Sequence, residues 1–396
     1  MLLQASKTVV VWALGTSQTL AWASSYYLPA VLGAPIAAGL NLPTSLFFAV
    51  FSATLLLQAV FGPYVGTLID RHGGRAVLTL SNLVLAAGLA TLGLAQGAAG
   101  LVIAWFLLGI GMTMGLYDAA FAALTRLYGR EARASITGIT LLAGFASTVG
   151  WPASAWFEHS FGWREACLIW AAVNLLIAMP LNWFLLPPAS PLPVGGAEKG
   201  ETSAAEPPRG AMPILAFYFC TTAFVTGALQ AHLLRFLEMA GASTAVAIIA
   251  STLVGPAQVV ARLCEFGLMR TFHPVWSARI AAVLHPLGGC ALGLPGMSGI
   301  AAFAIAYGAG NGMITIARGT LPLAIFGPVG YGLRTGLLSV PGRLSVAAAP
   351  FLFGLLLDRA GVYAVLLTVG LNLSAFGSLW LLRPRPAARA MPAAGN

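Results

Sequence analysis

One carboxylate stands deep inside a long apolar run in the first half of the chain. It is Asp118, in the segment Gly115-Leu-Tyr-Asp-Ala-Ala-Phe121. A charge in such surroundings costs several kcal/mol unless it faces water or a partner. Asp118 is therefore a candidate for binding a proton or a cation. The alternative is a structural acid that pairs with an arginine and holds two helices together.

Two arginines within apolar runs of the second half could partner an acid or an anion. Arg318 lies in Thr315-Ile-Ala-Arg-Gly319, and Arg343 follows Pro341-Gly342. A guanidinium suits carboxylate and phosphate groups because it can donate two parallel hydrogen bonds. Arg318 is expected either to contact a substrate or to pair helices. Arg343 is expected either to line a cavity or to satisfy backbone groups freed by the Pro-Gly pair.

Polar and aromatic side chains extend this set. Thr222, Thr226 and Gln230 recur at four-residue spacing, which places them on one face of a helix. Tyr26 belongs to an aromatic cluster that begins at Trp22, and it lines either the cavity or a membrane-interface belt. The candidate substrate- or proton-binding residues are Asp118, Arg318, Arg343, Tyr26, Tyr117, Thr222, Thr226, Gln230, Gln258 and Asn311.

The composition places these residues in a membrane. Of the 396 residues, 59% are hydrophobic and 8% are charged, whereas soluble chains carry about 25% charged residues. The apolar runs are long and do not alternate, so they predict membrane-spanning helices and not the strands of a barrel. Twelve spans are expected, at residues 8–32, 43–65, 76–96, 100–125, 135–157, 165–186, 213–236, 243–268, 277–294, 298–326, 334–357 and 361–382.

A polar, proline-rich segment divides the chain into halves and is predicted to be a flexible linker. The predicted domains are an N-terminal six-helix bundle (1–186), a cytoplasmic linker (187–211) and a C-terminal six-helix bundle with a short tail (212–396). The halves match at nearly constant offsets. A shift of 198 aligns Gly144 with Gly342 and Pro152 with Pro350. Six spans separate the copies, and this even number predicts a parallel repeat.

Basic residues predict the orientation. With a cytoplasmic N-terminus, fourteen lysines and arginines lie on the cytoplasmic side and three on the other. Such an excess is typical of cytoplasmic loops. Both termini are therefore expected in the cytoplasm, and the protein in the cell inner membrane. The fourteen are Lys7, Arg71, Arg75, Arg126, Arg130, Arg133, Lys199, Arg209, Arg270, Arg279, Arg334, Arg383, Arg385 and Arg389.

A polar turn, Gly66-x-Leu-x-Asp-Arg-x-Gly-x-Arg75, lies between the second and third expected spans. It resembles the signature found at this place in the major facilitator superfamily, although that signature usually has another basic residue at the position of Gly74. The twelve spans, the central linker and the six-plus-six repeat are also similar to that family. The resemblance implies an all-α fold of two pseudo-symmetric six-helix bundles that rock about a central cavity, and hence alternating access.

The same resemblance suggests how the halves are held together. The turn is interpreted as a clamp that closes the cytoplasmic side in an outward-open state. A shift of 195 aligns Asp70 with Glu265, so Arg262 and Glu265, three residues apart on one helix face, are expected to act as a gate or lock. The expected gating residues are Gly66, Asp70, Arg71, Gly73, Arg75, Arg262 and Glu265.

The repeat also relates the positions of the charged residues Asp118 and Arg318. A shift of 199 places Asp118 on Ala317, next to Arg318, at similar depth in the corresponding helix. An acid and an arginine at matched depth on either side of the cavity would form a pair that protonation or anion binding could open. Asp118 and Arg318 are therefore predicted to form a switchable pair.

These features predict a secondary active transporter of a small organic solute, anionic or zwitterionic, with proton coupling through Asp118 as a hypothesis. Proton-driven efflux of drugs or toxicants is the alternative, and symport and antiport both stay open. A membrane enzyme or a channel is disfavoured because the spans hold no catalytic cluster and no continuous polar stripe. No cofactor, metal site or nucleic-acid partner is expected. The expected partners are the substrate, the lipid bilayer and protons, and the protein is expected to be a monomer.

Overall fold

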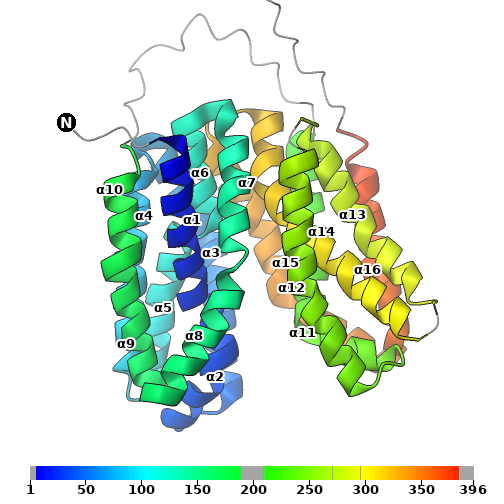
Figure 1. Ribbon diagram of the computed structural model, residues 1–396, viewed down its shortest axis with the longest axis horizontal. Helices are drawn as coiled ribbons and strands as arrows, with labels where there is room; N and C mark the ends of the chain where they lie inside the picture. The colour runs from blue at the N-terminus through cyan, green and yellow to red at the C-terminus, as the bar shows by residue number, and fades with distance from the viewer. Residues whose placement is uncertain (1–5, 189–207, 209, 270, 295, 383–396) are drawn as a thin grey trace, which may run out of the picture.

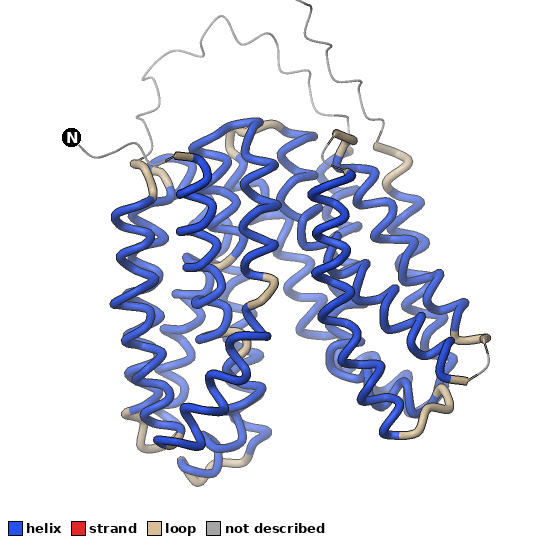
Figure 2. The backbone as a smooth tube through the Cα atoms, in the orientation of Figure 1, coloured by secondary structure: helices blue, strands red, loops and turns tan. Residues whose placement is uncertain are grey.

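A computed structural model of the protein describes residues 6–188, 208, 210–269, 271–294 and 296–382. The regular elements in these ranges are all helices (Figure 2). Most of the expected linker lies outside the described residues, as do Lys199, Arg209, Arg270, Arg383, Arg385 and Arg389.

The first half contains α1 (Lys7–Ser24), α2 (Leu28–Gly39), α3 (Thr44–His72), α4 (Gly74–Gly93), α5 (Ala98–Gly115), α6 (Tyr117–Tyr128), η1 (Gly129–Glu131), α7 (Ala132–Ala143), α8 (Ala146–Phe161), α9 (Trp163–Val173), the π-helical turn η2 (Asn174–Ala178) and α10 (Met179–Leu185). The second half contains α11 (Ala211–Met239), α12 (Thr244–Leu268), α13 (Pro274–Ala291), α14 (Met297–Phe326), α15 (Tyr331–Ala360), η3 (Gly361–Ala364) and α16 (Val365–Ser378).

These helices group into twelve segments across the described ranges. Eight helical stretches are long and apolar enough to cross a membrane. Two of them, Ala98–Phe161 and Tyr331–Ser378, fold back at a turn and contain two segments each. The other segments are α1 with α2, and α13, whose apolar runs are interrupted by polar side chains such as Gln18 and Arg279. The expected all-α membrane fold is confirmed.

The segments form two bundles that converge at one end and diverge toward the other (Figure 1). Helices α1–α10 make the N-terminal bundle, and α11–α16 make the C-terminal bundle. We call the converging end, where the chain leaves α10 and enters α11, the linker end, and the opposite end the far end. Hydrogen bonds across the bundle interface join α3, α6 and α7 to α12, α14 and α15.

Two spans that were expected to be continuous are broken where candidate residues lie. The expected span 8–32 divides into α1 and α2 around Tyr26, and proline stands in the first turn of α2. The expected span 100–125 divides at Leu116, whose backbone is extended. The side chain of Gln18 donates to the carbonyl of Gly115 at this break. Asp118 thus lies in the first turn of α6, where the helix dipole favours a negative charge.

A network of buried amides joins helices within the N-terminal bundle. The Asn182 Nδ2 atom donates to Asn82 Oδ1 at 2.7 Å and to Ser17 Oγ at 2.9 Å. Asn82 in turn donates to Asn174 Oδ1 at 3.3 Å, and Asn174 donates to Ser24 Oγ at 2.9 Å. Hydrogen bonds between membrane helices hold them in register because lipid offers no replacement partner.

We expect Asn182→Leu to destabilise the N-terminal bundle by about 1–3 kcal/mol, because Asn82 Oδ1 then stays buried without this donor. A lowered midpoint of thermal unfolding in detergent would show the effect. Leu176→Ala is the matched control, since Leu176 is 75% exposed. Equal midpoints for the two variants would contradict a structural role for the network.

Candidate functional site

Asp118 on α6 is held by two arginines from the C-terminal bundle. Its Oδ2 atom accepts hydrogen bonds from Arg343 Nη2 at 2.6 Å, from Arg318 Nη2 at 3.2 Å and from Ser339 Oγ at 3.0 Å. The exposed fraction of the side chain is 18% for Asp118, 15% for Arg343 and 42% for Arg318. Two positive charges face one negative charge, so the cluster keeps one excess positive charge. Arg318 presents that charge most openly.

The structure brings Asp118 and Arg318 together at the matched depth that the repeat predicts, and it adds residues that sequence reasoning missed. Gln58 Oε1 on α3 accepts a hydrogen bond from Arg343 Nη1. Gln58 is the only amide in the second expected span, which is a signal that could have identified it. Ser339 lies one helical turn before Arg343 on α15, but nothing in the sequence distinguishes it from other span serines.

Arg343 does not lie at a helix break. Helix α15 continues through Pro341, contrary to the expected interruption at the Pro-Gly pair. Its guanidinium instead donates to side chains of the opposite bundle, Asp118 and Gln58, and so joins the two bundles.

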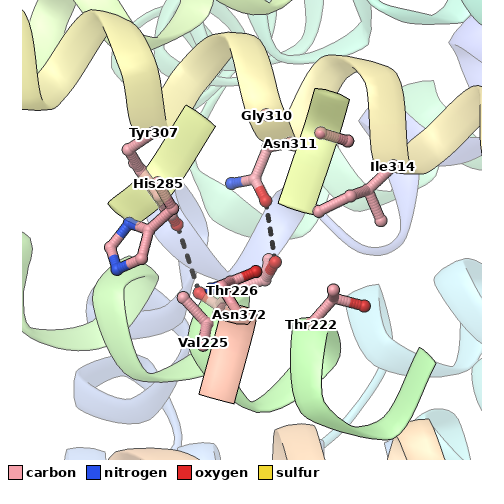
Figure 3. A pocket seen from close by; sticks show the side chains of 10 residues that line it. Thr222, Val225, Thr226, His285, Tyr307, Gly310, Asn311, Ile314 and Asn372 are labelled. Carbon is pink, nitrogen blue, oxygen red and sulfur yellow. Dashed lines mark hydrogen bonds between the residues drawn. The ribbon is translucent and has the colours of Figure 1, made fainter. Parts of the chain in front are cut away.

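The polar residues of the second half gather inside the C-terminal bundle (Figure 3). Thr226 Oγ1 donates to Asn311 Oδ1 at 2.7 Å, and the Tyr307 hydroxyl donates to the Thr226 carbonyl at 3.2 Å. Thr222 lines the same small pocket, together with His285, which was not among the candidates.

Other predicted residues lie outside this pocket. Gln230 is exposed, one turn beyond Thr226 on α11. Gln258 Oε1 accepts from Arg262 Nη2 at 3.5 Å, so Gln258 lies beside an expected gating residue.

The rings of Tyr26 and Tyr117 both pack against Trp22 in the N-terminal bundle. The ring centroid of Trp22 is 5.1 Å from that of Tyr26 and 4.9 Å from that of Tyr117. Tyr117 precedes Asp118 directly in the chain, so these aromatic rings adjoin the charged cluster. The break between α1 and α2 lets residues from the end of the first helix approach α6.

Asp70 connects the bundles at the linker end. Its Oδ1 atom accepts from the backbone N–H of Gly332 and its Oδ2 atom from that of Leu333, both at 2.9 Å. These N–H groups belong to the first turn of α15 and have no acceptor within their own helix. The carboxylate also lies at the positive end of the helix dipole. Asp70 is thus an N-terminal cap that is supplied by the other bundle.

Glycines in the turn allow this approach. A Cβ atom on Gly66 would lie 2.1 Å from the Gly332 carbonyl oxygen, so the crossing of α3 and α15 requires glycine. Gly73 has a φ of +85° between α3 and α4, which favours glycine. A Cβ atom on Gly74 would lie 2.1 Å from the Ala123 Cβ atom. A larger side chain at position 74, such as the usual basic residue, would therefore collide with α6.

The two arginines of the turn do not reach the other bundle through any contact found in the described residues. The Arg75 guanidinium stacks over the Trp183 ring at 4.7 Å, within the N-terminal bundle. Arg71 is exposed at the end of α3. The interpretation of the turn as a clamp between halves therefore depends on Asp70 and Gly66.

A second contact at the linker end is the pseudo-symmetric counterpart of the first. Glu265 on α12, 1% exposed, forms an ion pair with Arg133 Nη2 of α7 at 3.3 Å. Arg133 also donates to the Met269 carbonyl at 3.0 Å, and Arg262 Nη1 donates to the Thr140 carbonyl of α7 at 3.4 Å. Arg133 was missed as a site residue, although the shift of 198 places it on Tyr331, the first residue of α15.

Comparison with known proteins identifies the family. A family model described as Major Facilitator Superfamily matches residues 14–284. The chain belongs to the major facilitator superfamily. The human organic anion transporter MFSD10 has a similar structure, with a TM-score of 0.74 and 17% identity over 95% of this chain and 100% of that one.

Two further relatives extend the comparison. The E. coli fucose:proton symporter FucP aligns with a TM-score of 0.71 and 15% identity, over 96% of this chain and 99% of that one. An uncharacterized 38 kDa protein in a 23S RNA operon of Thermoproteus tenax is 28% identical over 77% of this chain and 78% of its own length. This major facilitator protein is therefore a membrane transporter and not an enzyme.

The Asp70 cap gives a direct test of the linker-end contact in this major facilitator protein. Hydrogen bonds to a charged group contribute about 1.5–3 kcal/mol, which corresponds to roughly a ten- to hundredfold population shift. We expect Asp70→Asn to increase the population of the state that is open at the linker end by such a factor. The measurement is the labelling rate of a cysteine placed at the α3–α15 interface. Arg71→Gln, one residue away and exposed, serves as the control, and equal labelling in both variants would count against the cap.

Proposed function

We propose that the protein is a secondary active transporter that moves a small organic anion across the cytoplasmic membrane by alternating access, coupled to protons. One observation carries the proposal: the carboxylate of Asp118 is shared by two arginines across the bundle interface, and Arg318 is half-exposed. The name of the MFSD10 relative, an organic anion transporter, and that of FucP, a proton symporter, agree with this substrate class and coupling ion.

The charges of the cluster explain how coupling would work. In the resting state, Asp118 partly neutralises Arg318 and Arg343, which leaves one excess positive charge. A proton on Asp118 releases both guanidinium groups, and an anion that binds them restores the same net charge. Proton and anion therefore bind best together, because neither alone keeps the charge of this desolvated site constant.

The arrangement of the bundles supports alternating access. The linker end is closed by the Asp70 cap and the Arg133–Glu265 ion pair, while the bundles diverge at the far end (Figure 1). We assign the linker end and both termini to the cytoplasm, from the excess of basic residues there, which makes this an outward-open state. The domain boundaries proposed from the sequence (1–186, 187–211 and 212–396) fit rocking of one bundle against the other.

Binding by purified protein tests the substrate class. Against a panel of carboxylates, neutral sugars and organic cations, we expect thermal stabilisation by carboxylates only. Arg318→Gln should weaken binding at least tenfold, since a charge-assisted hydrogen bond contributes about 1.5–3 kcal/mol. Arg235→Gln is the control, because Arg235 pairs with Asp358 at the exposed surface. Stabilisation by cations, or carboxylate binding that does not depend on Arg318, would exclude the proposal.

A further inference from the structure

Gln58 on α3 is a buried amide at the interface between the two bundles. It is 6% exposed, and its Oε1 atom accepts a hydrogen bond from Arg343 Nη1 of α15. A guanidinium group has only donors, so the amide must present its oxygen to Arg343. Gln58 is therefore a neutral acceptor, supplied by the N-terminal bundle, for a cation of the C-terminal bundle.

The glycine crossing of α3 and α15 places Gln58 beside Arg343. Asp70 contacts the first turn of α15 and Gln58 contacts its middle, so the two helices run antiparallel. A Cβ atom on Gly336 of α15 would lie 2.9 Å from the carbonyl oxygen of Gly62 on α3. Gln58 lies about one turn before Gly62, and Arg343 lies about two turns after Gly336. The close approach of the two backbones thus extends from the linker end to the charged cluster.

The two arginines of the cluster differ in what holds them once Asp118 is protonated. Arg343 donates through Nη2 to Asp118 and through Nη1 to Gln58, and its side chain is 15% exposed. Arg318 donates to Asp118 and to Ser339 of its own bundle, and its side chain is 42% exposed. Loss of the carboxylate charge weakens both contacts with Asp118, because a charge-assisted hydrogen bond is about twice as strong as one between neutral groups. Arg343 then still has its charge-assisted bond to Gln58 in the opposite bundle, whereas Arg318 becomes available to an anion.

We infer that Gln58 is a positioning residue that holds Arg343 at the bundle interface while Asp118 carries a proton. The inference rests on the proposed function and concerns its coupling. A protonated transporter without substrate keeps this contact, so its bundles do not part and no proton crosses alone. A bound anion is a stronger acceptor than a neutral amide, so it draws Arg343 away from Gln58 and lets the bundles move with both ligands bound.

Proton leak through the substrate-free protein tests this role. Proteoliposomes with a trapped pH-sensitive dye are given an imposed pH gradient, with potassium and valinomycin to balance charge and no organic acid present. Gln58→Leu removes the acceptor, and the leak rate is expected to rise about ten- to hundredfold over the wild type, the population shift that corresponds to one hydrogen bond to a charged group. Gln58→Glu keeps an oxygen acceptor for Arg343 and is expected to leak no more than the wild type.

Gln96→Leu is the matched control, because Gln96 is an exposed amide between α4 and α5. The double variant Gln58→Leu/Asp118→Asn is expected to leak no more than the wild type, since it has no carboxylate in the cluster to carry the proton. A leak that persists in the double variant would overturn the role of Gln58. Equal leak rates in Gln58→Leu and Gln96→Leu would overturn it as well.

Uphill uptake of a carboxylate separates this inference from the proposed function. If Gln58→Leu shows no added leak while the wild type still accumulates a carboxylate of the binding panel under the pH gradient, only the inference fails. If the wild type accumulates none of these carboxylates, the proposed function fails and the inference fails with it.

Discussion

Asp118→Asn is expected to reduce proton-driven accumulation of substrate to the level of protein-free liposomes, while exchange of substrate between the two sides continues. Asparagine keeps the shape of the side chain and can still accept from Arg343 and Ser339, but it takes up no proton at physiological pH. Without titration, an imposed pH gradient has no group at the bundle interface through which to act. The measurement compares uphill uptake with counterflow in proteoliposomes.

Glu131→Gln is the matched control for this experiment, because it also removes one carboxylate but from an exposed position that pairs with Lys7. We expect it to retain uphill uptake. If Asp118→Asn accumulates substrate as well as Glu131→Gln does, Asp118 is a structural acid and the proton enters elsewhere.

The second large effect concerns the crossing of α3 and α15. Gly66→Ala would place a Cβ atom 2.1 Å from the Gly332 carbonyl oxygen. Backbone cannot yield as a flexible side chain can, so the helices must separate. We expect the state closed at the linker end to lose about 1–3 kcal/mol, and transport to fall with it, because overpacking carries this cost.

Spin-label distances across the linker end measure this shift. Labels at His72 and Val329, exposed on opposite bundles, are expected to report a longer distance in Gly66→Ala than in the wild type. Gly62→Ala is the matched control, since a Cβ atom on Gly62, one turn earlier on α3, meets no atom within 4 Å. Identical distance distributions in the two variants would contradict the role of the glycine crossing.

Much of this site was predictable from the sequence of one chain. The internal repeat relates the positions of residues along corresponding helices of the two halves, and so indicates which residues lie at similar depth in the membrane. The offset that aligned Asp118 with the neighbour of Arg318 predicted their proximity, and the offset between Asp70 and Glu265 predicted two related contacts at one end. Charges in apolar helices are few, so the pairing of the acid with arginines followed from the cost of burying them.

The remaining features depend on three-dimensional packing that hydropathy does not record. At the break at Leu116, the side chain of Gln18 from another helix donates to the Gly115 carbonyl. No feature of the sequence near Leu116 predicts this break. Arg133 was expected in the loop between the spans 100–125 and 135–157 and was counted only for orientation, although its side chain crosses to Glu265. His285 was not among the candidates, because nothing in its own span indicated the hydrogen bond that it forms with Thr368 of α16.

Simultaneous recording of anion and proton movement tests the central claim most directly. Proteoliposomes that contain the wild-type protein and a trapped pH-sensitive dye are given a labelled organic acid from the panel under an imposed pH gradient. The account predicts that anion and proton move together and that a protonophore abolishes accumulation. It also predicts that Asp118→Asn abolishes the proton signal. Anion accumulation without accompanying proton movement, or a proton signal that persists in Asp118→Asn, would contradict it.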